Sequence, residues 1–130
     1  MSKSISDYLS CIDRLYELHQ RLSRVIVLNT NGIELLKKYN NENVFVYCDP
    51  PYEQSTRTSV RYNVDMNEKE HIEFLNTAIS SKLKILISGY DCKLYNILTD
   101  NNFKKIQFEV KTVDKNNNPK TKIETLWKNY

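Results

Sequence analysis

Short apolar runs alternate with segments of helical period along this chain of 130 residues. The runs are Arg24–Leu28 (R-V-I-V-L), Val44–Cys48 (V-F-V-Y-C) and Lys84–Ser88 (K-I-L-I-S). Each run is rich in β-branched residues and too short for a helix, so each predicts a strand. Uninterrupted apolar runs with helices between them are typical of parallel strands that are covered on both faces. The pattern therefore predicts an α/β fold, and the length is that of a single domain over residues 1–130.

Helices fill most of the chain between these strands. Apolar residues at helical spacing predict an amphipathic helix that ends near Leu22, and shorter helices over residues 33–39, 67–80 and 91–98. Asn67 followed by Glu70 is the signature of a capping box at the start of one of them.

The last part of the chain has a different period. Apolar and polar residues alternate over residues 103–113 and again over residues 121–127, with an asparagine-rich turn between the two segments. This pattern predicts an antiparallel hairpin at the end of the sheet.

Glycine and cysteine usage excludes several kinds of site. The only glycines are Gly32 and Gly89, so the chain holds no glycine-rich loop for a nucleotide or a phosphate. Cys11, Cys48 and Cys92 are far apart in the sequence, which favours neither a disulfide framework nor a zinc site. We expect no bound metal and a reducing compartment.

The net charge of +3 permits an acidic partner such as nucleic acid, although a small excess of lysine is more typical of a solvated surface. The chain starts with a polar segment, and no run approaches the roughly 20 apolar residues that cross a bilayer. We therefore expect a cytoplasmic protein without a membrane segment.

The second apolar run leads directly into D-P-P-Y, residues Asp49, Pro50, Pro51 and Tyr52. The prolines prevent both a further strand residue and an ordinary helix start, so the turn after the strand is rigid. Ligands of α/β sheets bind at the carboxyl ends of parallel strands, where Asp49 is expected. The structural alternative is a turn or helix cap with Tyr52 packed on the sheet edge.

D-P-P-Y after an apolar strand resembles the catalytic motif of the amino-group methyltransferases that use S-adenosylmethionine. The resemblance implies that Asp49 and the backbone carbonyl of Pro50 each accept a hydrogen from the target amine. These contacts would aim the nitrogen lone pair at the methyl group. Tyr52 would stack on a base that has been taken out of the duplex.

The whole chain is similar to the carboxyl-terminal part of the Dam-like adenine DNA methyltransferases. Besides C-D-P-P-Y, the segments I-D-R-L, E-x-x-H, I-S-G-Y-D-C and E-T-L-W-K-N-Y carry this resemblance. It implies a partial Rossmann-like sheet and a contact of Asp49 with the methionine end of the cofactor. Asn31 and Ile33 would lie near the cofactor adenine.

The polar segment over residues 53–66 has no period and predicts a loop. Within it Arg57, Arg61 and Tyr62 are candidates for contacts with DNA phosphates, or they are ordinary polar residues of a loop. His71 and Trp127 are expected to be packing residues.

In the family that the chain resembles, a cofactor loop F-x-G-x-G and most of the DNA-reading domain precede the part seen here. The present chain has neither, which indicates a split or truncated enzyme. Two strands would then be absent between Arg24–Leu28 and Val44–Cys48, and the second of these runs would have an open edge. We expect the chain to close that edge by pairing its own first strand, by dimerising, or with strands from a partner chain.

Two alternatives stay open at this point. D-P-P-Y also occurs in RNA amino-group methyltransferases, although the Y-D-C segment and the L-W-K-N-Y ending favour DNA. The other alternative is a non-catalytic remnant that binds nucleic acid or assembles with other subunits.

Overall fold

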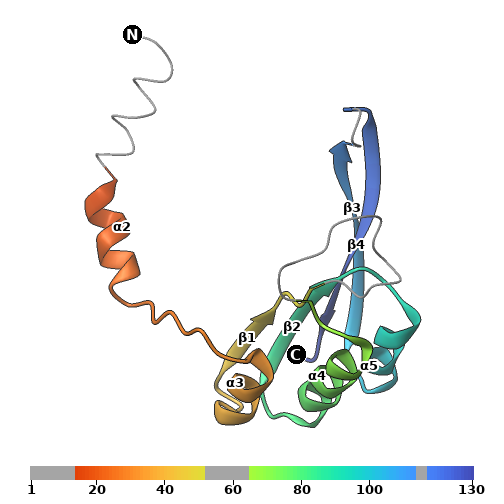
Figure 1. Ribbon diagram of the computed structural model, residues 1–130, viewed down its shortest axis with the longest axis horizontal. Coiled ribbons are helices and arrows are strands. Elements are labelled where there is room, and N and C mark those ends of the chain that lie inside the picture. The colour runs from red at the N-terminus through yellow and green to blue at the C-terminus, as the bar shows by residue number, and fades with distance from the viewer. Residues whose placement is uncertain (1–13, 52–64, 114–116) are drawn as a thin grey trace. The chain divides into compact units, whose positions relative to one another are not determined.

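The computed structural model describes residues 14–51, 65–113 and 117–130. The chain divides into two units, Met1–Thr30 and Asn31–Tyr130, each of which is described by itself (Figure 1). The second unit holds the sheet and the candidate site.

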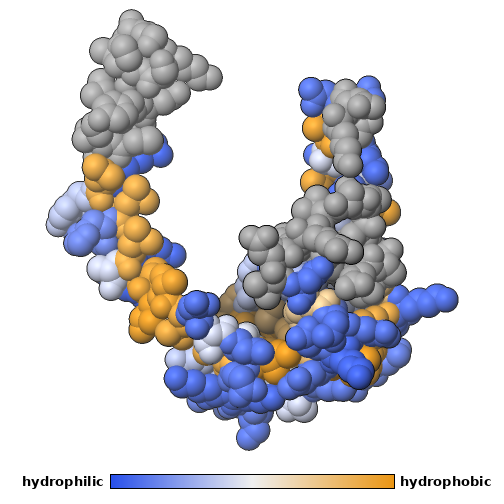
Figure 2. Space-filling model, in the orientation of Figure 1, coloured by the Kyte–Doolittle hydropathy of each residue, from blue (hydrophilic) through white to orange (hydrophobic). Residues whose placement is uncertain are grey.

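The first unit contains the amphipathic helix α2, Leu15–Leu22, which ends where the sequence predicts. The strand predicted over Arg24–Leu28 is wrong, because residues 25–29 adopt neither helix nor strand. Ile26 and Val27 are 83% and 89% exposed. Apolar residues are visible along this unit in the space-filling view (Figure 2). A strand needs a hydrogen-bonded neighbour, and this segment has none in the described part of the chain.

The second unit is a mixed α/β structure built on a four-stranded sheet in the order β1-β2-β4-β3. The strands are β1, Phe45–Cys48; β2, Lys84–Gly89; β3, Lys104–Val113; and β4, Pro119–Lys128. β1 and β2 are parallel, and β4 is antiparallel to both β2 and β3. The predicted parallel pair and the predicted terminal hairpin are both confirmed.

Helices precede β1 and connect β1 to β2 and β2 to β3. They are α3, Gly32–Lys38; α4, Glu68–Ser80; the 3-10 turn η2, Lys93–Tyr95; and α5, Asn96–Asp100. The capping box predicted for α4 is confirmed, since the Asn67 side chain accepts from the Glu70 backbone N–H and the Glu70 carboxylate accepts from the Asn67 backbone N–H. No helix in the described stretches is both long enough and apolar enough to cross a membrane.

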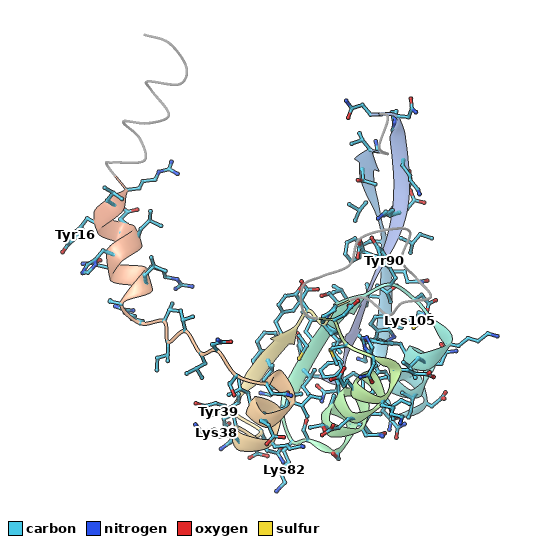
Figure 3. All side chains as sticks on the ribbon, in the orientation of Figure 1. Tyr16, Lys38, Tyr39, Lys82, Tyr90 and Lys105 are labelled. Carbon is cyan, nitrogen blue, oxygen red and sulfur yellow. The ribbon has the colours of Figure 1, made fainter. Side chains whose placement is uncertain are left out.

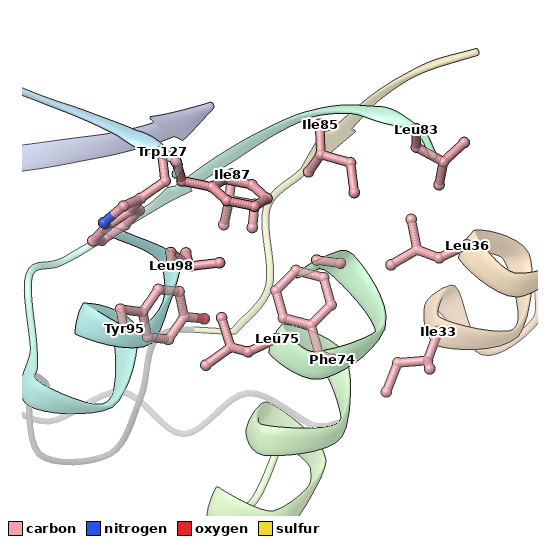
Figure 4. Packing of buried hydrophobic residues seen from close by; sticks show 12 residues of the cluster. Ile33, Leu36, Phe74, Leu75, Leu83, Ile85, Ile87, Tyr95, Leu98 and Trp127 are labelled. Atoms are coloured by element: carbon pink, nitrogen blue, oxygen red, sulfur yellow. The ribbon is translucent and has the colours of Figure 1, made fainter. Parts of the chain in front are cut away.

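The hydrophobic core lies between one face of the sheet and the helices (Figure 4). Ile85 and Ile87 from β2 and Trp127 from β4 are at most 1% exposed. They belong to the same core as Phe74 and Leu75 of α4. On the opposite face, Phe45 and Tyr47 of β1 are 53% and 56% exposed. The prediction that both faces of the parallel strands are covered is therefore wrong for the described residues of the second unit taken by itself, because the helices of this unit pack on one face only.

The edge strands of the sheet differ from the inner strand β2, whose pairing is extended by an asparagine side chain. β1 and β3 are its edge strands. At the amino end of β2, the side-chain amide of Asn129 donates to the carbonyl of Leu83 at 2.8 Å and accepts from the N–H of Ile85 at 2.8 Å. This side chain continues the pairing of β2 beyond the end of β4.

Candidate active site

Asp49 follows β1 directly and lies at the carboxyl end of the parallel strand pair. The register pairs Cys48 with Ile87, which places Ser88 beside the point where β1 ends. The Ser88 hydroxyl Oγ lies 3.0 Å from Asp49 Oδ1 and 3.4 Å from the carbonyl oxygen of Cys48. The carboxylate is exposed but held by a neighbouring strand.

A tyrosine extends this contact. The Tyr47 hydroxyl donates to Ser88 Oγ at 2.9 Å. Because successive side chains of a strand point to opposite faces, Tyr47 and Asp49 share the face opposite to the buried one. Tyr47, Ser88 and Asp49 thus form a hydrogen-bonded chain on the open face, at the end of the sheet where ligands of α/β proteins bind.

Charged and polar side chains also gather where β2 ends. Asp91 accepts from Lys105 Nζ at 2.6 Å and from Gln107 Nε2 at 3.3 Å. Lys122 Nζ donates to the Tyr90 hydroxyl at 3.0 Å, and this hydrogen bond is the main cause of a raised Lys122 pKa. Tyr90 and Lys105 are seen in Figure 3. Asp91 is thus engaged by the hairpin, whereas the hydrogen bonds of Asp49 come from Ser88 alone among the described residues.

The other predicted site residues that the structure describes lie in two regions, the segment after β1 and the start of α3. Pro50 and Pro51 are half-buried in the segment after β1. Asn31 caps α3, accepting from the Ile33 N–H at 2.8 Å, and Ile33 is a core residue, 7% exposed. Neither residue makes a hydrogen bond with Asp49 in the described part of the chain. Their predicted cofactor contacts thus fall on residues that already cap a helix and fill the core.

The remaining predicted residues of the site lie outside the described residues. They are Tyr52, Arg57, Arg61 and Tyr62.

His71 is a packing residue, as the sequence predicts. It is 1% exposed, and its Nδ1 lies 3.2 Å from the Tyr95 hydroxyl. The Tyr95 ring in turn packs on Trp127 with ring centroids 5.0 Å apart. This cluster lies on the buried side of the sheet, away from the face that carries Tyr47 and Ser88.

Burial also controls the thiol next to the candidate site. It raises the pKa of Cys48 from 9.0 to about 11. A neutral thiol is a poor nucleophile, so Cys48 is suited to packing under the strand rather than to chemistry.

Sequence reasoning missed Ser88, which holds Asp49, and Tyr47, which donates to Ser88. Tyr47 and Ser88 each lie inside an apolar run, where the sequence does not distinguish a functional polar side chain from an ordinary strand residue. The available signal was the spacing: Ser88 is the last polar residue before β2 ends, as Asp49 is the first after β1.

A model of a known protein family covers most of the chain. The family model of the D12 class N6 adenine-specific DNA methyltransferases matches residues 7–117. The chain belongs to this family. No curated protein matches it, and no solved structure does.

Membership of the D12 class makes the chain a methyltransferase by family, with adenine in DNA as the group acted on. The match extends over both units and includes the whole of β1, β2 and the segment between them. The resemblance drawn from D-P-P-Y is confirmed at the level of the family.

Proposed function

We propose that this chain carries the amine-binding half of an S-adenosylmethionine-dependent adenine DNA methyltransferase. The observation that supports the proposal is the exposed Asp49 carboxylate, held by Ser88 at the carboxyl end of β1 in a chain of the D12 family. The RNA enzyme and the non-catalytic remnant have no comparable support.

The chemistry follows from what a carboxylate and a carbonyl can do. The exocyclic amine of adenine is a poor nucleophile because its lone pair is delocalised into the ring. Asp49 and the Pro50 carbonyl each accept one amine hydrogen, which localises the lone pair and orients it. Tyr52 stacks on the extruded base, and Arg57, Arg61 and Tyr62 contact the DNA backbone. S-adenosylmethionine supplies an electrophilic methyl group.

The residues of this chain account for contacts with only part of S-adenosylmethionine. Asp49 offers an exposed acceptor for the amino group of its methionine end, and Asn31 and Ile33 at the start of α3 are proposed to lie near its adenine. With Gly32 and Gly89 as the only glycines, the 130 residues supply no glycine-rich loop for the remainder. We infer that this loop comes from further sequence or from a partner chain.

For the assembly we propose a Rossmann-like methyltransferase sheet. The proposed location of the assembly is the cytoplasm. β1 is an edge strand here, so added strands from a partner or a second copy can pair with it. In that assembly residues 1–130 form the carboxyl-terminal catalytic part of one domain.

Methyl transfer from tritiated cofactor to adenine-containing DNA tests the proposal, with the chain alone and with candidate partners. Asp49→Ala should lower the rate by about 10²- to 10³-fold, the usual effect of losing one stabilising group in an active site. Asp91→Ala is the matched control, since it removes a carboxylate from the end of the neighbouring strand. Equal rates for Asp49→Ala and the wild type refute the mechanism, and faster transfer to an RNA of the same sequence favours the RNA alternative.

Cofactor binding by calorimetry tests the incomplete site separately. The isolated chain should bind S-adenosylmethionine weakly or not at all. Tight binding would overturn the inference that the glycine-rich loop comes from elsewhere.

A further inference from the structure

The hydroxyl groups of Ser88 and Tyr47 have an arrangement that decides which oxygen of Asp49 stays open. Tyr47 donates to Ser88 Oγ at 2.9 Å, and Ser88 Oγ lies 3.0 Å from Asp49 Oδ1. Tyr47 and Ser88 come from the adjacent parallel strands β1 and β2, and Asp49 directly follows β1.

The protons and lone pairs of each group determine which group donates and which accepts in these hydrogen bonds. A serine hydroxyl has one proton and two lone pairs, and a carboxylate only accepts. Because Tyr47 occupies a lone pair of Ser88, the serine proton points to an acceptor. The Asp49 oxygen at 3.0 Å is closer than the Cys48 carbonyl at 3.4 Å, and a charged acceptor forms the stronger bond. Successive donors of this kind also strengthen each other.

The positions of these side chains in the sheet also indicate from which face a ligand reaches Asp49. Cys48 and Ile87 point to the buried face, so Tyr47 and Ser88 point to the face on which Tyr47 is 56% exposed. Asp49 Oδ1 is turned toward Ser88 on this face. The second oxygen, Oδ2, is the one left for a ligand.

We propose that Ser88 and Tyr47 are positioning residues that fix the Asp49 carboxylate so that Oδ2 accepts the hydrogen of the target amine. This inference rests on the proposed function of Asp49. Ser88 does not touch the substrate; it sets the plane of the group that does. A carboxylate free to rotate would present the acceptor in the required orientation for only part of the time.

Kinetics of the active assembly test the inference. Ser88→Ala should lower kcat by about 10- to 100-fold, the factor expected when a hydrogen bond to a charged group is lost. The KM values for DNA and cofactor should change little, because the lost contact acts on orientation and not on binding. Ser88→Thr keeps the hydroxyl on a strand residue and should recover most of the rate.

Tyr47→Phe removes only the outer hydroxyl of an exposed side chain and should lower kcat less, by about 2- to 5-fold. Tyr130→Phe is the matched control, because its ring also lies on the sheet and contacts Phe45, with centroids 5.7 Å apart. It should leave kcat unchanged. An unchanged kcat for Ser88→Ala, or an equal loss for Tyr130→Phe, overturns the inference.

A readout without catalysis separates this inference from the proposed function. The carboxyl carbon of Asp49, labelled with carbon-13 and assigned through Asp49→Asn, should shift in Ser88→Ala and Tyr47→Phe but not in Tyr130→Phe. An unshifted signal in Ser88→Ala refutes the hydrogen-bonded chain. Absence of methyl transfer by every wild-type assembly overturns the proposed function, while the carbon signal still decides whether Ser88 holds Asp49.

Discussion

The two faces of the sheet contain similar side chains and are used differently. On one face Ile85, Ile87 and Trp127 are at most 1% exposed and pack under the helices. On the other, Phe45 and Phe108 are 53% and 45% exposed. Apolar composition therefore does not distinguish the two faces, whereas burial does. The covered face supplies stability, and the open face holds the hydrogen-bonded chain that ends at Asp49.

The largest expected difference between the faces concerns aromatic side chains of the hairpin. Trp127→Ala should lower the free energy of unfolding by about 3–5 kcal/mol, because it opens a cavity in the core. Phe108→Ala on the open face should cost about 1 kcal/mol or less, because its side chain is already partly in water. Urea denaturation of both variants measures the difference. Equal losses would show that the open face is covered in solution.

A smaller effect concerns the helix that covers the buried face. Asn67→Ala removes the capping side chain of α4 and should cost about 1 kcal/mol. Asn76→Ala, on an exposed position inside the same helix, should stabilise by a few tenths of a kcal/mol because alanine is the better helix former. Denaturation curves for the pair test the role of the cap, and losses of the same size would contradict it.

The smallest effect appears only at high pH. Burial raises the Cys48 pKa from 9.0 to about 11, so the folded state holds the thiol proton more tightly than the unfolded state. This contribution to stability is present below pH 9.0 and is lost as the pH rises toward about 11. The wild type should therefore lose more stability than Cys48→Val between these values. Parallel curves for the two proteins would place Cys48 in water and not on the covered face.

Much of the second unit could be predicted from the sequence because its signals are local. The β-branched runs, the capping box and the alternating hairpin each contain their own pattern. R-V-I-V-L is as apolar as V-F-V-Y-C, yet residues 25–28 are not a strand, whereas Phe45–Cys48 pairs with β2. Propensity favours an extended chain, but hydrogen bonds to a neighbour make it a strand, and a neighbour cannot be read from the run itself.

The same limit applies to the candidate site. Asp49 could be predicted because D-P-P-Y is contiguous in the sequence. Ser88 could not, because it meets Asp49 through the register of two strands separated by 39 positions. The burial of the two faces of the parallel strands was also mispredicted. An uninterrupted apolar run does not require cover on both faces, because aromatic residues tolerate partial exposure.

The two edges of the sheet carry different chemistry. β3 presents Lys104, Lys105, Glu109 and Lys111 along its length. Such charges discourage pairing with a further strand, because they would have to lose water. β1, with the sequence F-V-Y-C, has no charge at all. The charges of the two edges therefore differ in the direction that the proposed assembly requires: the strand added to the sheet would pair with the uncharged edge β1, which bears the D-P-P-Y turn.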